Sequence, residues 1–347
     1  MRVGVTGATG FTGGALARRL AADGHEVVCL ARDAARLPPE VQSGAVVANP
    51  DSSGWAQNFA HGLDCVIHVA AMYRNNGPRE EFEQVNVGMT KALLEACEAA
   101  GVKRFVYIST IGVHGSVPQV PADENAPIAP QDDYQETKLE AEQLSRAFGE
   151  SNGLEVAIIR PCAIYGPGDT RMLKLFQMVQ NGTFFFVGRF DAYFHAVYID
   201  DLVDAMMLAA TRPEAAGETF IIGGPNYQKL RDYVGEAAKT LGVRQPWINL
   251  PWLPMYVAAW MMEKAGLLFD FQPPLHRRRL KFFKHNRGFT TEKARRLLGY
   301  DPQVELAEGF SRTVAWYRAE NLLPPVKGAP KRDTVDKRLS QSSDSPR

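Results

Sequence analysis

The first 160 residues alternate between short apolar runs and longer mixed stretches that have the composition of helices. The apolar runs are rich in Val, Ile and Leu and are bounded by Gly, Pro, Asn or Asp, which predicts strands. Six strands are predicted in this way, at residues 3–5, 26–30, 45–48, 64–71, 105–108 and 156–159. Because the runs are apolar along their whole length, both faces of the sheet must be covered. We therefore predict an α/β fold with a doubly wound parallel sheet of the Rossmann type.

Three glycines follow the first strand at a spacing of three, Gly7, Gly10 and Gly13, and a helical stretch begins at Gly14. A dinucleotide-binding turn requires a glycine at each of these places. The first allows a sharp turn, the second allows the backbone to approach the ligand closely, and the third allows the helix to pack tightly on the strand. The free N–H groups and the positive dipole of the new helix would face the phosphates of the ligand. The sequence therefore predicts a dinucleotide site at the carboxyl end of the first strand.

The residues after the second strand select between the two nicotinamide cofactors. An acidic side chain there accepts hydrogen bonds from the adenosine ribose, whereas a basic one pairs with a 2′-phosphate. This chain has Ala31-Arg32-Asp33 at that place. Arg32 is the better placed of the two charged residues, so we predict NADP(H) in preference to NAD(H), while Asp33 keeps NAD(H) open.

Tyr134 and Lys138 are four residues apart at the start of a predicted helix, so they share one face of it. A nearby ammonium group favours the phenolate and lowers the pKa of a tyrosine, which otherwise lies at about 10. Tyr134 is then able to take a proton from an alcohol or to give one to a carbonyl. Ser109 and Thr110 end the fifth predicted strand and supply a hydroxyl for the substrate oxygen. This set predicts hydride-transfer chemistry, with Lys138 also available to the nicotinamide ribose.

In combination these motifs resemble the extended short-chain dehydrogenase/reductases, the NAD-dependent epimerase/dehydratase family. Within it, the 3β-hydroxysteroid dehydrogenase and dihydroflavonol-reductase-like branch is the most similar. The matching stretches run in family order: Thr6–Gly13, Asp64–Ala71, Asn86, Val106–Gly115, Tyr134 with Lys138, Arg160–Gly168, Val197–Leu202 and residues 217–224. The resemblance implies a Ser/Thr–Tyr–Lys triad in which Thr110, five residues before Gly115, supplies the hydroxyl, with Ser109 as its neighbour.

The resemblance also implies which residues contact the cofactor. They are Gly7, Gly10, Phe11, Thr12, Gly13, Arg32, Ala70, Ala71, Tyr134, Lys138 and Pro161. Two departures from the family pattern concern the adenosine end of the cofactor. After the second strand, Ala31-Arg32 stands where NAD-using members carry an acidic residue. After the third strand, where family members often carry an acidic residue, this chain has Asn49-Pro50-Asp51, which would border the adenine.

A division of the chain into domains follows from the same resemblance. Residues 1–165 would form the dinucleotide-binding domain, with residues 184–222 returning to its sheet. Residues 166–183 and 223–322 would form a smaller substrate lobe. Residues 323–347 are rich in Pro, Lys, Ser and Asp, which predicts a disordered tail.

Bulk properties narrow the class of protein. The 39 basic and 39 acidic residues balance, so no global positive field favours nucleic acid, and we expect no nucleic-acid partner. The four cysteines are scattered without a metal-binding spacing, so we expect buried free thiols and no metal. No secretory signal pattern is visible, which favours a cytoplasmic protein.

Residues 245–262 carry no charge and contain three tryptophans. A helix of about 14 residues, predicted over 255–268, would be roughly 21 Å long, which is too short to cross a hydrocarbon core of about 30 Å. A basic run follows at 276–284. An apolar helix beside a basic run is typical of a peripheral membrane contact, here through 255–284. Two other roles stay open for this helix, a roof over an apolar substrate pocket and a subunit interface in a homodimer.

Three functions fit these residues. The first is an oxidoreductase that moves hydride between NADP(H) or NAD(H) and a secondary alcohol or ketone of a bulky apolar substrate, as in 3β-hydroxysteroids. The second is a nucleotide-sugar epimerase or dehydratase with tightly bound NAD, for which Arg171, Lys174 and Arg189 are the basic residues available to a diphosphate. The third is a cofactor-sensing binding protein, which would not need a proton donor. We favour the first, because the triad is intact and the C-terminal half is apolar and aromatic.

Overall fold

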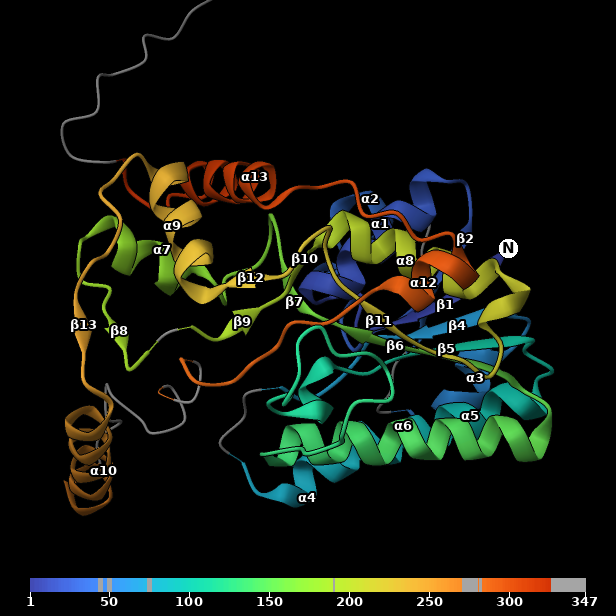
Figure 1. Ribbon diagram of the computed structural model, residues 1–347. Coiled ribbons are helices and arrows are strands. Elements are labelled where there is room, and N and C mark those ends of the chain that lie inside the picture. The colour runs from blue at the N-terminus through green and yellow to red at the C-terminus, as the bar shows by residue number, and fades with distance from the viewer. Residues whose placement is uncertain are drawn as a thin grey trace, which may run out of the picture.

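The computed structural model describes residues 1–42, 46–48, 52–73, 77–189, 191–269, 280 and 283–325. Its centre is a seven-stranded sheet (Figure 1). The strands are β1 (Arg2–Thr6), β2 (Glu26–Leu30), β3 (Val46–Ala48), β4 (Cys65–His68), β5 (Arg104–Ile108), β6 (Glu155–Pro161) and β11 (Thr219–Ile222). They lie in the order β11-β6-β5-β4-β1-β2-β3, and every neighbouring pair is parallel. The predicted doubly wound parallel sheet is confirmed.

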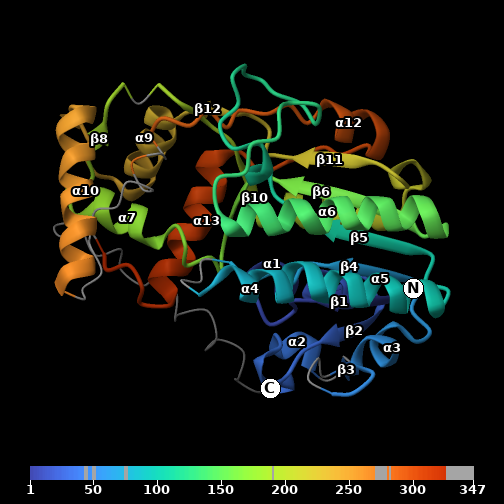
Figure 2. The same ribbon diagram turned by 90° about the horizontal axis from the view of Figure 1, so that it is seen from below.

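Helices cover both faces of this sheet, as the apolar strands require. One face carries α1 (Phe11–Ala22) and α8 (Ile199–Thr211), and the other carries α3 (Trp55–Ala60), α5 (Met89–Ala99) and α6 (Asp133–Asn152) (Figures 1 and 2). Two hydrophobic clusters correspond to the two faces, and successive strand residues alternate between them. The four cysteines are buried free thiols, as predicted.

A smaller lobe lies beyond the carboxyl ends of the strands (Figure 1). Its helices are α7 (Leu173–Gln180), α9 (Leu230–Leu241), α10 (Trp252–Phe269) and α13 (Leu306–Ala319). Three two-stranded sheets join them: β7 (Ala163–Tyr165) with β10 (Ala196–Tyr198), β9 (Tyr193–Phe194) with β12 (Gln228–Lys229), and β8 (Phe186–Val187) with β13 (Asn249–Leu250). The core of the lobe is continuous with the cluster on the α1 face of the main sheet, so sheet and lobe share one core.

The division between domain and lobe differs from the predicted one in three places. Residues 184–222 are predicted to return to the main sheet, but of their strands only β11 joins it. The strand β8 pairs with β13 and the strand β9 pairs with β12, and both of these partners belong to the lobe. The helix α12 (Glu292–Leu298) packs against β11 and α8, not in the lobe. The predicted tail begins too early, because Leu323 is buried and the Gln180 amide donates to the carbonyl of Pro324 at 2.9 Å. Residues 326–347 lie outside the described residues.

Two helices have other boundaries than predicted. The apolar helix α10 begins at Trp252, three residues early, because prolines are tolerated in a first helical turn. We also predict one long helix over residues 82–100 from the sequence, and the structure divides this segment into α4 (Arg79–Phe82), a π-helical turn η2 (Glu83–Gly88) and α5. Such π turns are frequent at functional sites, and this one contains Asn86. The predicted adenine border, Asn49–Asp51, lies outside the described residues.

Candidate active site

The glycine turn has the geometry that its spacing predicts. Gly7 has a φ of 73°, and its carbonyl accepts the N–H of Gly10 at 2.9 Å. A Cβ on Gly13 would lie 2.3 Å from the same carbonyl, so only glycine fits there. The helix α1 begins after Gly10 with no side-chain cap and no acidic residue in its first turn. Its first N–H groups are therefore available to a phosphate, and the partly exposed Phe11 and Thr12 lie beside them.

The ends of β1 and β4 are fixed side by side at the topological switch point of the sheet. The hydroxyl oxygen of Thr6 accepts the N–H groups of Val69 and Ala70, both at 3.0 Å, and lies 2.7 Å from Nδ1 of His68. Burial lowers the pKa of His68 to about 3, so this imidazole is neutral. Ala70 and Ala71 are partly exposed there, and small side chains leave room for a ligand along the backbone. Open α/β sheets bind their ligands at this kind of crevice.

Asn86 ties the loop after β4 to the helix that carries Tyr134. Its side-chain oxygen accepts the N–H of Met72 at 2.8 Å, and its amide nitrogen donates to the Thr137 hydroxyl at 3.0 Å. Asn86 is almost completely buried, so these bonds are not exposed to competing water. The sequence identified Asn86 only as part of a family motif, and the structure gives it a positioning role for α6.

Tyr134 lies in the first turn of α6. The carboxylate of Asp132 caps this helix by accepting the N–H of Gln135 at 3.0 Å. The Tyr134 ring is half-buried and meets the ring of Tyr73 edge-on, with centroids 4.8 Å apart. Helix cap and ring contact together fix the direction of the phenol at the carboxyl edge of the sheet.

Thr110, and not Ser109, supplies the hydroxyl beside Tyr134. The Thr110 oxygen accepts the N–H of Gly112 at 3.0 Å, which leaves its own proton to donate, and this side chain acts to lower the pKa of the Tyr134 phenol. Ser109 is buried, and its hydroxyl donates to the Glu142 carboxylate at 2.6 Å. Neighbouring residues of an extended strand point to opposite sides, so only one of the two reaches the site. The expectation that Ser109 contributes to catalysis is therefore corrected.

Lys138 is buried one turn below Tyr134. Its Nζ lies 4.1 Å from the centre of the Tyr107 ring. Burial lowers the pKa of Lys138 to about 7, and the negative charge of Glu142 acts in the opposite direction. Burial also raises the pKa of Tyr134 above its ordinary value, whereas Arg171 and the Thr110 side chain lower it. The sequence predicts a depressed phenol pKa, and the structure differs because desolvation is the largest influence on Tyr134.

Arg171 brings a positive charge from the lobe to the glycine turn. Its Nε donates to the Asp169 carboxylate at 2.7 Å, and an Nη donates to the carbonyl of Ile164 at 3.1 Å. The guanidinium lies over the Phe11 ring, 5.4 Å from its centre. The sequence considered Arg171 only as a diphosphate ligand. Its position links the start of α1 to Tyr134, whose pKa it lowers.

Arg287 is a site residue that the sequence reasoning missed. Its Nε is buried and has no hydrogen-bond partner among the described residues. Burial lowers the pKa of this arginine, while the charges of Tyr73 and Asp132 raise it, so the guanidinium lies near the start of α6. Nothing in the sequence separates Arg287 from the basic residues that precede it, because only the tertiary fold brings it to Tyr73 and the start of α6.

The remaining predicted residues lie at the edges of the site. Arg32 is exposed directly after β2. The carboxylate of Asp33 accepts the N–H of Ala35 at 2.9 Å and so caps the short helix η1 (Ala34–Arg36). Pro161 is buried at the end of β6, opposite Ile222 of β11. Of the two charged residues after β2, Arg32 is therefore the one whose side chain has no hydrogen bond or ion pair within the described part of the chain.

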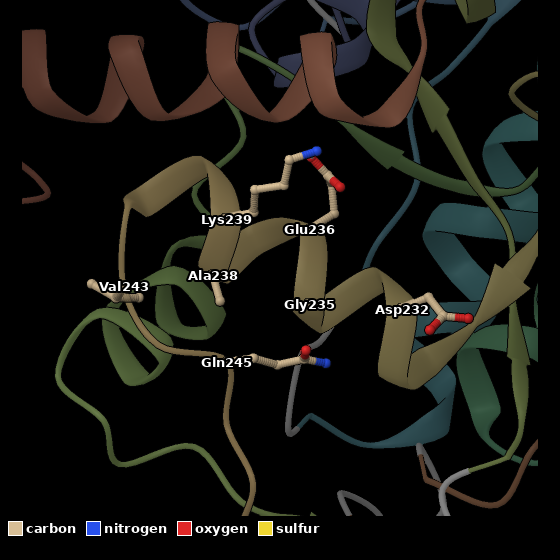
Figure 3. Close-up of a pocket in the computed structure, with 7 residues that line it drawn as sticks. All are labelled: Asp232, Gly235, Glu236, Ala238, Lys239, Val243 and Gln245. Carbon is tan, nitrogen blue, oxygen red and sulfur yellow. The ribbon is translucent and has the colours of Figure 1, made fainter.

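A separate, shallow pocket lies on α9 in the lobe (Figure 3). Its charged side chains include Glu236 and Lys239, which form an ion pair at 3.5 Å. The lining residues are Asp232, Gly235, Glu236, Ala238, Lys239, Val243 and Gln245. None of them belongs to the candidate active site.

Comparisons with known proteins agree with this geometry. A profile of the NAD dependent epimerase/dehydratase family matches residues 3–223. Short-chain dehydrogenase/reductase family 42E member 1 of Danio rerio is 31% identical over 344 residues, covering 91% of this chain and 87% of that protein. The 3-beta-hydroxysteroid dehydrogenase of Mycolicibacterium neoaurum is 30% identical, covering 95% of this chain and 97% of that protein.

Two solved structures extend the comparison to three dimensions. The crystal structure of gox2253 has a TM-score of 0.77 at 28% identity and covers 93% of this chain and 99% of its own. DesIV, a dTDP-glucose 4,6-dehydratase from Streptomyces venezuelae with NAD bound, has a TM-score of 0.73 at 26% identity and covers 94% of this chain and 100% of its own. The chain therefore belongs to the NAD-dependent epimerase/dehydratase family of extended short-chain dehydrogenase/reductases, enzymes that use a nicotinamide cofactor to oxidise or reduce a CH–OH carbon.

Proposed function

We propose that this protein is an NADP(H)-preferring dehydrogenase or reductase. Its substrate is a secondary alcohol or ketone of a bulky apolar molecule of the 3β-hydroxysteroid type. The observation that carries the proposal is the placement of Thr110, at the end of β5, and of Tyr134 and Lys138, at the start of α6, at the sheet edge where the glycine turn lies. Relatives named as 3-beta-hydroxysteroid dehydrogenases, alike over almost their full length, support the substrate class.

In this proposal the substrate oxygen lies between Thr110 and Tyr134. The cofactor supplies or accepts the hydride when it is bound. Thr110 donates a hydrogen bond, and the Tyr134 phenol is protonated at neutral pH because burial raises its pKa, so it is ready to protonate a carbonyl during reduction. Oxidation needs the phenolate instead. We therefore expect the rate of oxidation, relative to reduction, to rise with pH.

The alternative is a nucleotide-sugar epimerase or dehydratase with tightly bound NAD. Two guanidinium groups favour it, that of Arg171 near Tyr134 and that of Arg287 near Tyr73 and Asp132, because arginine is well suited to a diphosphate. The similarity to DesIV points the same way. A dehydrogenase changes the net amount of reduced cofactor, whereas an epimerase or dehydratase returns the hydride to its substrate.

The test is an assay of the purified protein with a 3β-hydroxysteroid and, separately, with UDP-glucose. We expect the protein to purify without cofactor and, when NADP⁺ is added, to produce reduced nicotinamide, followed by its near-ultraviolet absorbance, only with the steroid. Retained NAD and conversion of the nucleotide sugar without net absorbance change would replace the proposal by the alternative.

The cofactor preference is tested at Arg32. Replacing Arg32 with Ala removes the exposed charge proposed to pair with the 2′-phosphate, a charge-assisted contact worth about 1.5–3 kcal/mol. We expect Kd for NADPH to rise by roughly 10–100-fold while Kd for NADH is unchanged. The control is Arg36→Ala, which removes the same charge from the exposed arginine at the end of η1. If the position of Arg32 is what matters, Kd for NADPH is unchanged in this control. An unaltered ratio of the two affinities in Arg32→Ala would refute the assignment.

A further inference from the structure

One side of the apolar helix α10 is not covered by the rest of the described chain. Seven of the ten large apolar side chains that are exposed in the described residues lie between residues 247 and 261. Leu253 is 70% exposed and Trp260 is 45% exposed. In both views α10 stands at the outer edge of the lobe, away from the main sheet (Figures 1 and 2). Exposed apolar surface of this extent marks an interaction site.

The exposed side chains of α10 form one stripe. At 100° per residue they fall within less than half of the helix circumference. They are Leu253, Tyr256, Val257, Trp260 and Met261, with the exposed Lys264 at the end. The opposite side is the one that packs on the lobe, where buried Ala259 contacts a small cluster around Val187 of β8. The helix is thus held flat on the lobe by one face and presents the other outward.

The exposed charges beside the stripe are positive, whereas the one acid of α10, Glu263, is only partly exposed. Lys264 follows the stripe on α10, and Nζ of Lys284 lies 5.6 Å from the centre of the Trp252 ring at the start of the helix. In the sequence between these two lysines, four more basic residues accompany one acid, Asp270; they are Arg277, Arg278, Arg279 and Lys281. The structure does not describe those four residues, and Lys264 and Lys284 supply the positive charge beside the stripe.

These observations distinguish between two kinds of partner. A second copy of the chain, bound through a two-fold axis, would bring the same positive charges against each other at the edge of the interface. A membrane with anionic lipid would meet the apolar stripe with its acyl region and the lysines with its headgroups. Among the described residues no helix is long and apolar enough to cross a membrane. The helix would therefore lie in the plane of the interface.

We propose that α10 is an in-plane membrane contact, in which the stripe from Leu253 to Met261 enters the headgroup region of a bilayer that contains anionic lipid. Trp260 and Tyr256 are the side-chain types favoured at that depth. The contact is independent of the proposed reaction, since none of its residues belongs to the candidate active site. It would also keep the enzyme where an apolar substrate is dissolved.

The test measures co-sedimentation of the full chain with vesicles of phosphatidylcholine, with and without phosphatidylglycerol. We expect binding to be stronger with phosphatidylglycerol and to weaken as salt is raised. Leu253→Glu and Trp260→Glu should each lower vesicle binding by roughly 10–100-fold, the effect of losing one large buried apolar side chain. Ile128→Glu, the same change at an exposed apolar residue outside the lobe, is the matched control and should bind like the wild type.

Folding of each variant is checked by circular dichroism, and the association state is measured by sedimentation velocity without lipid. Equal vesicle binding by the wild type and the stripe variants would overturn the proposal, as would no binding to either vesicle. A wild-type dimer that Leu253→Glu converts to a monomer, without vesicle binding, would also overturn it and assign the stripe to a second copy of the chain.

Discussion

Replacing Tyr134 with Phe is expected to lower kcat by roughly 10²–10⁴-fold, the usual contribution of a positioned general acid or base. The substitution removes the phenol oxygen that exchanges a proton with the substrate oxygen and leaves the ring that contacts Tyr73. Cofactor affinity should be unchanged, because the glycine turn and the start of α1 are untouched. Steady-state kinetics and cofactor titration by fluorescence measure the two effects separately.

The matched control is Tyr256→Phe, which makes the same chemical change at an exposed position on α10 and should keep the wild-type kcat. Turnover by Tyr134→Phe at the wild-type rate would show that another group supplies the proton. A loss of turnover together with a loss of cofactor binding would point to a disturbed site and not to missing proton transfer.

Replacing Glu142 with Gln is expected to destabilise the protein by about 3–5 kcal/mol, because it leaves a buried guanidinium without its counter-charge. The side chains of Glu142 and Arg160 are only 3% and 7% exposed, and their ion pair is 2.5 Å long. Glu142 also accepts the hydroxyl of Ser109, while an Nη of Arg160 lies 3.0 Å from Nε2 of His114. The pair thus joins α6 to the ends of β5 and β6 from inside the molecule.

The same substitution should alter the pH dependence of the reaction, since Glu142 raises the pKa of Lys138. Without that negative charge the Lys138 pKa falls further below its present value of about 7, and the ammonium form is lost at lower pH. We expect the alkaline limb of kcat/KM that reports Lys138 to move to lower pH. Glu142 is therefore a positioning residue with an electrostatic effect on the site.

The stability change is measured as the shift in the urea unfolding midpoint, with Glu150→Gln, an exposed glutamate near the end of the same helix, as the control that should change little. Adding Arg160→Met to Glu142→Gln removes the unpaired charge and should recover part of the loss. If the midpoint of Glu142→Gln equals that of the control, the buried pair does not stabilise the fold.

The sheet and the glycine turn were predictable because their causes are local. Each strand is marked by its own apolar run, and Gly7 and Gly13 are required by a positive φ and a 2.3 Å approach within one short turn. The helix carrying Tyr134 and Lys138 was predictable for the same reason, since an i, i+4 pair needs only helical geometry.

The parts that escaped prediction depend on contacts between distant segments. Ser109 and Thr110 are adjacent, and only the buried carboxylate of Glu142 shows which of them is turned away from the site. Arg287 reaches the start of α6 from more than 150 residues away in the chain, and the lowered Lys138 pKa depends on complete burial against Tyr107. Neither the hydrophobic periodicity of the sequence nor the spacing of its motifs indicates contacts of this kind.

The central claim is that hydride leaves the substrate and stays on the cofactor. It is tested most directly by incubating the protein with NADP⁺ and a 3β-hydroxysteroid that carries deuterium at the carbinol carbon, followed by mass spectrometry of the cofactor. We predict one deuterium per reduced nicotinamide and a ketone product without label. Deuterium that remains on the organic substrate, with no net reduction of the cofactor, would contradict this account.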